Sequence, residues 1–114
     1  MRRDHKERTI CELLEAYPRL PFVLIGDSGE NDPEIYSAVV RRFPRRIRAI
    51  YIRSVNRKPS RLFALDRLVA QVAASDSQLV LAADAESAAA HAAAEGLIQA
   101  SDLRAVRSER EAEA

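Results

Sequence analysis

The fold of this chain is decided by the stretch FVLIGDSGENDPEIY, residues 22–36. Its first four residues are apolar and have the length of a buried strand, which Gly26 ends. Asp27 enters a loop, and a helix then begins at Asp32 and Pro33. An Asp that precedes a Pro is also a typical N-cap of a helix, which is the alternative role for Asp32. Two carboxylates, Asp27 and Asp32, are therefore expected at the carboxyl end of one strand.

That edge of a parallel sheet is where open α/β proteins bind ligands, because the strand ends leave a crevice beside helix N-termini. Two acids repel each other there unless a cation or a shared proton lies between them. A hard divalent cation such as Mg²⁺ suits the pair, since it takes one or two carboxylates and completes its shell with water and phosphate oxygens. We therefore predict that Asp27 and Asp32 hold Mg²⁺.

The residues before this stretch predict a helix whose apolar face repeats at the helical spacing: Ile10, Leu13, Leu14 and Tyr17. Asp4 with Glu7 can cap its start, and Pro18 ends it. About 13 helical residues rise about 19 Å, close to the span of about 16 Å expected for a five-residue strand. We therefore expect Lys6, near the helix start, to lie at the same edge as Asp27.

Five more elements are predicted after the first strand: a helix from Asp32 to Pro44 with Ile35, Val39 and Phe43 inward, a strand over 47–52 buried on both faces, a helix capped near Ser60, a strand over 79–82, and a helix from Asp84 to Gly96. The order α-β-α-β-α-β-α predicts parallel strands joined by helical crossovers. We expect a three-layer, Rossmann-like α/β fold in residues 1–101 and a charged tail over residues 102–114.

Composition narrows the possible functions of the 114-residue chain. Its formal net charge is +1, which gives no field that would favour nucleic acid. The single cysteine, Cys11, allows no internal disulfide and suits a reducing compartment. We find neither a signal peptide nor an apolar run of the roughly 20 residues that a membrane span needs. We therefore expect a soluble cytoplasmic protein, with peripheral membrane contact as the alternative.

The segment from His5 to Tyr36, with HK and LLEAYPRLPFVLIGDSGENDPEIY, and the later string RAIYIRSV at residues 48–55 resemble the actin-patch-associated phosphatidate phosphatase family, a branch of the haloacid dehalogenase superfamily. The resemblance extends over residues 5–98. It implies a haloacid dehalogenase type of fold and a Mg²⁺-dependent phosphatidate phosphatase. It also implies that Asp27 and Asp32 are the acidic Mg²⁺ ligands and that Lys6 is the catalytic lysine that steadies the phosphoryl group.

One motif of that family does not occur in the 114 residues. The family's first motif, Asp-x-Asp-x-Thr, supplies the aspartate that attacks phosphorus and the general acid and base, and no such string is present. We therefore assign no nucleophile and expect the carboxyl-terminal half of a catalytic domain, inactive by itself. A half sheet exposes a strand edge and an apolar face, which predicts self-association or pairing with the missing amino-terminal half.

Basic residues gather in two places. One group follows the second predicted strand and comprises Arg53, Arg57, Lys58 and Arg61. We expect it to attract an anionic phospholipid headgroup to the metal edge, where Ser28 is a further predicted substrate-binding residue. The other group surrounds the turn at the opposite end of the sheet, where we expect a solvated loop, with contact to an anionic membrane as the alternative: Arg41, Arg42, Arg45, Arg46 and Arg48.

Two other functions remain as alternatives. Gly26-Asp27-Ser28 is similar to the first block of Gly-Asp-Ser esterases, but neither His5 nor His91 has an aspartate three residues before it to complete a base for Ser28. A non-catalytic binding module, or one that completes a partner's active site, is the other alternative. The remaining polar residues are predicted to be ordinary: Asp84 as an N-cap, His5 and His91 as surface residues, and Cys11 outside the apolar face and without chemistry.

Overall fold

The computed structural model describes residues 3–29, 31–54 and 58–99, with side chains from residue 5 onward. The expected cap concerns the side chain of Asp4, which lies outside this description, and Arg57 and the charged tail lie outside the described residues. The chain forms two compact units, residues 1–81 and 82–114, and each is described by itself.

Within the described residues the elements alternate between helix and strand, as predicted. In chain order they are α1 (Arg3–Ala16), β1 (Phe22–Asp27), α2 (Asp32–Arg42), β2 (Ile47–Arg53), α3 (Pro59–Ala73), β3 (Leu79–Ala82) and α4 (Ala85–Ala94). Each strand matches its predicted position to within two residues, because short apolar runs bounded by Gly, Pro or charged residues mark strands well. The expectation that Asp27 lies in a loop is wrong, since β1 continues through Gly26 to Asp27 by pairing with β2.

The three strands form one sheet in the order β1-β2-β3. β1 and β2 are parallel, in a register that begins with Phe22 opposite Ile47 and ends with Asp27 opposite Arg53. The N–H of Ile50 donates to the carbonyl of Gln78 at 2.7 Å and joins β2 to the segment that enters β3. The predicted parallel α/β fold is confirmed, and β1 lies at one edge of its sheet.

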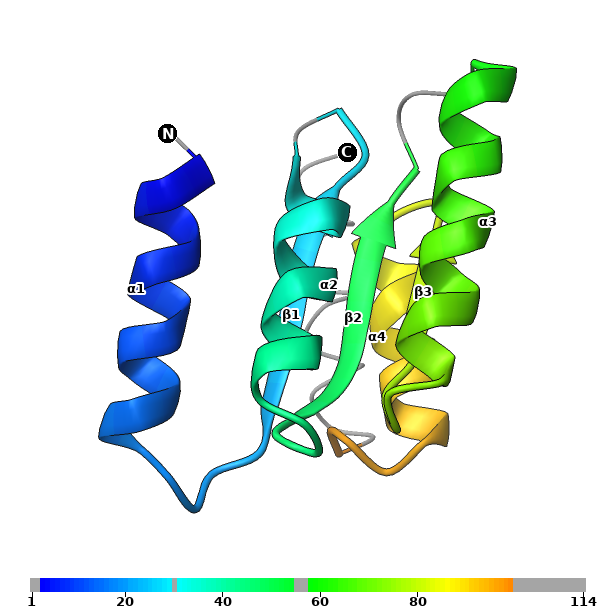
Figure 1. Ribbon diagram of the computed structural model, residues 1–114. Coiled ribbons are helices and arrows are strands. Elements are labelled where there is room, and N and C mark those ends of the chain that lie inside the picture. Colours follow the sequence, from blue (N-terminus) through cyan, green and yellow to red (C-terminus); the bar gives the residue numbers. More distant parts are fainter. Residues whose placement is uncertain (1–2, 30, 55–57, 100–114) are drawn as a thin grey trace. The chain divides into compact units, whose positions relative to one another are not determined.

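Three helices form one layer on one face of this sheet (Figure 1). α2 packs against β1 and β2, and α1 and α3 each pack against α2, with α1 on the side of β1. The core between helices and strands is apolar and includes Leu14, Leu24, Ile35, Tyr36, Val39, Val40, Ile47, Ile50, Ile52, Val72 and Leu79. Ala49 to Ile52 of β2 are buried, as a central strand requires.

The buried face of α1 differs from the predicted one. Leu14 and Cys11 are buried at 0% and 5% exposure, whereas Leu13 and Tyr17 are 45% and 52% exposed. The prediction was wrong for Leu13, Tyr17 and Cys11 because α1 packs on a neighbouring helix rather than on the sheet. A helix that touches one other helix buries a narrower strip than one that lies on a sheet.

The starts of α2 and α3 also differ from expectation. Asn31, not Asp32, is the N-cap of α2, and Asp32 is the first helical residue. Lys58, not Ser60, is the N-cap of α3, followed by Pro59 in the first turn. Neither cap residue makes a side-chain hydrogen bond to the helix. The proline in each first turn fixes the start instead, because its φ angle is already helical.

The second unit contains α4, whose ends confirm the prediction. Asp84 is its N-cap, and its Oδ1 accepts a hydrogen bond of 2.8 Å from the N–H of Ser87. Gly96 has a φ of 75°, in the left-handed region where glycine closes a helix without strain. His91 is not isolated, since its Nε2 lies 3.7 Å from a carboxylate oxygen of Glu95, one turn along α4.

Candidate functional site

Lys6 and Asp32 meet at the carboxyl end of β1. The Nζ atom of Lys6, near the start of α1, lies 2.5 Å from Oδ1 of Asp32, and their side chains are 29% and 7% exposed. Because α1 runs antiparallel to β1 over a similar length, its first turns stand beside the end of the strand (Figure 1). The predicted position of Lys6 is therefore confirmed.

The other oxygen of Asp32 binds the backbone of β1. Oδ2 accepts a hydrogen bond of 3.2 Å from the N–H of Asp27. One carboxylate thus joins the start of α2 to Lys6 of α1 and to the last residue of β1. The interpretation of Asp32 as an N-cap is wrong, because its carboxylate faces β1 and Lys6 rather than its own helix.

Gly26 makes room for this carboxylate. A Cβ atom added at Gly26 would lie 2.4 Å from Oδ2 of Asp32, a distance at which one of the two must move. The sequence-based prediction used Gly26 only as the end of a strand. The signal for its role was a glycine directly after an apolar run of strand length, since a glycine within a strand often marks a close approach to the backbone.

Asp27 is the more accessible of the two acids. Its Oδ1 accepts a hydrogen bond of 3.0 Å from the N–H of Gly29, and its Oδ2 lies 3.7 Å from Nη2 of Arg53. The side chains of Asp27 and Arg53 are 31% and 60% exposed, so that solvent screens this ion pair. Asp27 and Asp32 are adjacent, as predicted, and both face positive side chains.

Tyr36 belongs to the same cluster, and sequence reasoning gave it no role. Its hydroxyl donates a hydrogen bond of 2.9 Å to the carbonyl of Ile25. Burial raises the pKa of Tyr36, the charges of Asp32 and Asp27 raise it further, and Lys6 lowers it. The signal was its spacing, since residues four apart such as Asp32 and Tyr36 share one helix face.

Arg61 joins the loop after β1 to α3. Its Nε donates to the carbonyl of Ser28 at 3.2 Å, and its guanidinium pairs with the carboxylate of Glu34 on α2. From the sequence, Arg61 was expected among the residues that attract a headgroup. In the structure its guanidinium instead holds the loop between Asp27 and Asp32 and the first turn of α2.

The predicted substrate-binding residues are not equally accessible. Ser28 is only 2% exposed, and its N–H donates to the carbonyl of Arg53 at 2.9 Å. That burial gives no support to Ser28 as a substrate contact or as an esterase nucleophile. Arg53 and Lys58 are exposed on the side of the acids, and Arg57 lies outside the described residues.

The basic residues at the opposite end of the sheet include a structural one. The Nη2 atom of Arg46 donates to the carbonyls of Tyr17 and Leu20 at 2.5 and 3.1 Å, and its guanidinium lies 5.8 Å from the ring of Phe22. The expectation of a solvated side chain is wrong for Arg46. It is confirmed for Arg41, Arg45 and Arg48, which are exposed, whereas Arg42, also exposed, contacts the sulfur of Cys11.

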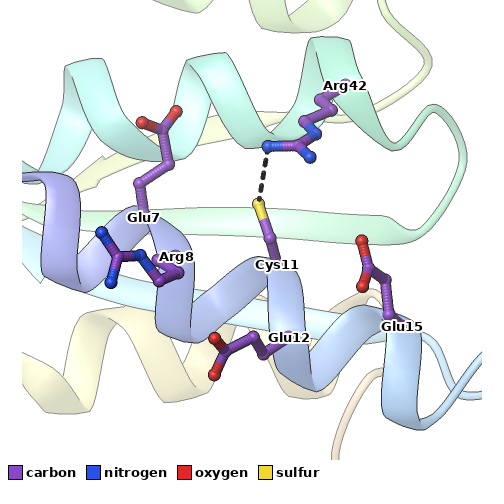
Figure 2. A pocket seen from close by; sticks show the side chains of 6 residues that line it. All are labelled: Glu7, Arg8, Cys11, Glu12, Glu15 and Arg42. Carbon is purple, nitrogen blue, oxygen red and sulfur yellow. Dashed lines mark hydrogen bonds between the residues drawn. The ribbon is translucent and has the colours of Figure 1, made fainter.

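A hollow of about 350 Å³ lies between α1 and α2, and neither Lys6 nor Asp32 belongs to its lining (Figure 2). Its lining comprises Glu7, Arg8, Cys11, Glu12, Glu15 and Arg42. A guanidinium nitrogen of Arg42 lies 3.7 Å from the sulfur of Cys11. Burial, with Glu7 and Glu15, raises the pKa of the Cys11 thiol despite Arg42, so that the thiol stays protonated at neutral pH.

The number of acids near one another limits the metal chemistry of the residues that the structure describes. Within them, no cluster of three or more His, Cys, Asp or Glu side chains has the geometry of a metal site. The acids at the end of β1 therefore offer two carboxylates to a cation. No described helix combines the length and the apolar character that crossing a membrane requires.

Comparison with known proteins identifies the segment that carries this site. Residues 1–54 match the profile of the family described as "Phosphatidate phosphatase APP1, catalytic domain". Over 50 residues the chain is 44% identical to the Phosphatidate phosphatase APP1 of Saccharomyces cerevisiae, an alignment that covers 44% of this chain and 8% of that protein. No solved structure matches the chain.

The matched segment contains Lys6, Asp27 and Asp32, the three residues that meet at the end of β1. The chain spans only a small part of the length of its yeast relative. Residues 1–54 of this chain are thus similar to the phosphatidate phosphatase APP1 catalytic domain.

Proposed function

We propose that this chain is part of the catalytic domain of a Mg²⁺-dependent phosphatidate phosphatase of the haloacid dehalogenase type. It would contribute the lysine and the acidic metal ligands but not the nucleophile. One observation carries the proposal: Lys6 of α1 and Asp32 of α2 meet against the backbone of Asp27, where β1 ends. Phosphoryl transfer needs positive charge beside the phosphate, which a lysine and a metal ion held by two acids would supply together.

The residues at this edge fit a magnesium ion. Asp27 and Asp32 provide hard carboxylate oxygens, and Mg²⁺ is commonly held by one or two carboxylates with water and substrate phosphate. The ammonium of Lys6 at Oδ1 of Asp32 marks the point where this chain already needs a positive charge. When bound there, the ion would polarise a phosphoryl oxygen and offset its negative charge.

Each side chain has a distinct task in this proposal. Asp32 is fixed by the N–H of Asp27 and by contact with Gly26, so that it orients the cation. Asp27, the more exposed acid, would complete the cation's protein ligands. Lys6 would neutralise the phosphoryl group during transfer, since its flexible stem carries a point charge.

We propose phosphatidate as the substrate, because the yeast relative is named a phosphatidate phosphatase and because basic side chains are exposed at this edge. Arg53 and Lys58 are exposed there and would attract an anionic phospholipid headgroup. Such a substrate lies in a membrane, so that the protein would act in the cytoplasm with peripheral contact to the bilayer. Ser28 and Arg57 remain predicted substrate contacts without structural support.

Phosphate release from phosphatidate vesicles with Mg²⁺ tests the proposal. The assay compares the chain alone with a version joined to an upstream segment that carries Asp-x-Asp-x-Thr. We expect no release from the chain alone, release from the joined protein, and a loss of about 100-fold or more when Asp27→Asn or Lys6→Met removes charge stabilisation.

Asp84→Asn is the matched control for the loss of a carboxylate, because Asn is an equally good N-cap. Its activity in the joined protein should equal that of the unchanged sequence. The proposal would be wrong if the chain alone released phosphate at the joined protein's rate. It would also be wrong if Asp27→Asn had no more effect than Asp84→Asn.

A module that completes a partner's active site is the second candidate function. It is favoured by the position of β1 at the edge of the sheet and by the 70% exposure of Ile25 on that strand. An open strand edge accepts a further strand by backbone hydrogen bonding. Restored activity on mixing the two parts, without covalent joining, would support this function.

A further inference from the structure

The ammonium of Lys6 occupies the oxygen of Asp32 that a metal ion would need. We propose that Lys6 and a divalent cation compete for Asp32, and that cation binding releases Lys6 to contact a phosphate group. The inference rests on the proposed function, and it gives Lys6 the role of a counter-ion to Asp32 before phosphate binds. Lys6 then acts as an internal counter-ion that the metal replaces.

The two carboxylate oxygens of Asp32 have different partners. Oδ1 is 2.5 Å from the ammonium of Lys6, and Oδ2 accepts the N–H of Asp27. A cation that binds Oδ1 directly would stand almost where the ammonium stands, and two positive charges repel strongly at such a distance. The cation and Lys6 therefore exclude each other at this oxygen.

Asp32 is held more firmly than Lys6. Asp32 is 7% exposed in its side chain, bound to the backbone of β1 and packed against Gly26, so that it has no free direction. Lys6 has a four-carbon stem and a side-chain exposure of 29%. The lysine is therefore the group that leaves, and the carboxylate stays in place for the ion.

The released lysine has a use at this edge. Arg53 and Asp27 lie at the same edge, where a phosphate that shares the cation would bring further negative charge. The freed ammonium has that phosphate as its nearest new partner. Because coupling between two binding sites is reciprocal, Mg²⁺ and phosphate should each raise the affinity for the other.

Isothermal titration calorimetry of Mg²⁺ binding to the full chain tests the competition. Lys6→Met removes the competing charge and keeps a side chain of similar length, so that the variant should bind Mg²⁺ about tenfold more tightly, within the usual range of coupling between sites. Arg8→Met is the matched control, because Arg8 is exposed on α1 and lines the hollow of Figure 2 instead. Its affinity for Mg²⁺ should be unchanged.

A double-mutant cycle shows whether Lys6 acts through Asp32. In an Asp32→Asn background, Lys6→Met should no longer tighten Mg²⁺ binding, because the shared oxygen has lost its charge. A general field effect of Lys6 on Asp27 would persist in that background. Circular dichroism of each variant verifies that the helices are retained.

Inorganic phosphate extends the same titrations. In the unchanged chain, saturating Mg²⁺ should raise the affinity for phosphate by about tenfold, and Lys6→Met should abolish most of that gain. The inference is overturned if Lys6→Met binds Mg²⁺ no more tightly than the unchanged chain, or if no variant binds Mg²⁺. It is also overturned if the tightening persists with Asp32→Asn.

These outcomes are independent of the phosphatase assay. The joined protein can release phosphate even if Lys6 and Mg²⁺ bind side by side, in which case only the competition fails. Conversely, competition in the chain alone together with an inactive joined protein would contradict the proposed function and leave the competition intact.

Discussion

Asp32 owes its orientation to a residue that has no side chain. Its carboxylate lies within 2.4 Å of the place that a Cβ atom at position 26 would take, and from there it reaches both Lys6 and the N–H of Asp27. A glycine inside a strand usually weakens it. Here that cost is offset by a carboxylate that joins three elements of the first unit.

We predict that Gly26→Ala destabilises the protein. The added methyl group would overlap Asp32, and overpacking of this kind costs about 1–3 kcal/mol in the free energy of unfolding. Urea denaturation followed by circular dichroism measures the change. In the double variant Gly26→Ala with Asp32→Gly all the overlapping side-chain atoms of Asp32 are gone, so that the alanine at position 26 should cost less there than in a chain that keeps Asp32. An equal cost in both would contradict the packing explanation.

Tyr36 gives a prediction about alkaline pH. Its pKa is raised above the usual 10.0, mainly by burial and then by Asp32 and Asp27, so that the folded protein holds the phenolic proton more tightly than the unfolded chain does. The stabilisation is complete below pH 10 and is lost as the pH rises through the folded pKa. Urea titrations at pH 9 and 11 should show a smaller decline for Tyr36→Phe than for the unchanged chain. Equal declines would show that Tyr36 ionises normally.

At the scale of single residues, the sequence predicted the acids but not their support. Asp27 and Asp32 follow a recognisable apolar run and precede a proline, which are local signals. The roles of Gly26, Tyr36 and Arg61 depend on which atoms of other elements approach them, and no local pattern contains that information. The cap assigned to Asp32 failed for the same reason, since its carboxylate is drawn away by a lysine 26 positions earlier.

Among the elements, the connection between α1 and β1 depends on one side chain. Arg46 follows α2, and its guanidinium binds two carbonyls of the segment that leads from α1 into β1, those of Tyr17 and Leu20. The N–H of Phe22 donates to the carbonyl of Arg46 at 2.9 Å and continues the contact into the sheet. This end of α1 is thereby fixed, and the other end carries Lys6.

We predict that Arg46→Ala destabilises the protein by about 1–3 kcal/mol, because two carbonyls of the connection lose charged donors. Arg48→Ala is the matched control, since Arg48 is an exposed arginine on β2, two residues along the chain. Thermal unfolding measures both variants. The account of this connection would be refuted if the two variants had the same melting temperature.

The elements themselves were largely predictable, whereas their contacts were not. The strands and the order of elements follow from apolar runs, prolines and glycines, and matching the lengths of helix and strand brought Lys6 to the correct edge. The buried side of α1 was mistaken because Leu13 and Leu14 satisfy the same helical period. Only the position of α2 decides that Leu14 and Cys11 face inward.

For the molecule as a whole, the edge of the sheet at β1 exposes apolar side chains of the first unit. Ile25 is 70% exposed and Val23 is 38% exposed on this strand. Tyr36 and Asp32 already bind the carbonyl of Ile25 and the N–H of Asp27. Bonds of this kind reduce the backbone groups open to another strand and so limit uncontrolled pairing.

We predict that the chain self-associates and that Ile25→Lys reduces the association. A lysine on an edge strand opposes strand addition, and at 70% exposure the substitution should leave the fold intact. Sedimentation velocity at several concentrations measures the change. Leu20→Lys, an exposed apolar residue outside the strands, is the control and should have little effect. Association that is unchanged by Ile25→Lys would place the contact elsewhere.

We expect Asp27 and Asp32 to form a cation site at the end of β1, and nuclear magnetic resonance with Mn²⁺ locates such a site amide by amide. Substoichiometric Mn²⁺, which binds Mg²⁺ sites and broadens nearby amide signals, is added to the full chain. We predict that the signals of Asp27, Gly29 and Asp32 broaden first. Broadening confined to the amides of Glu7, Glu12 and Glu15, or no selective broadening, would contradict the claim.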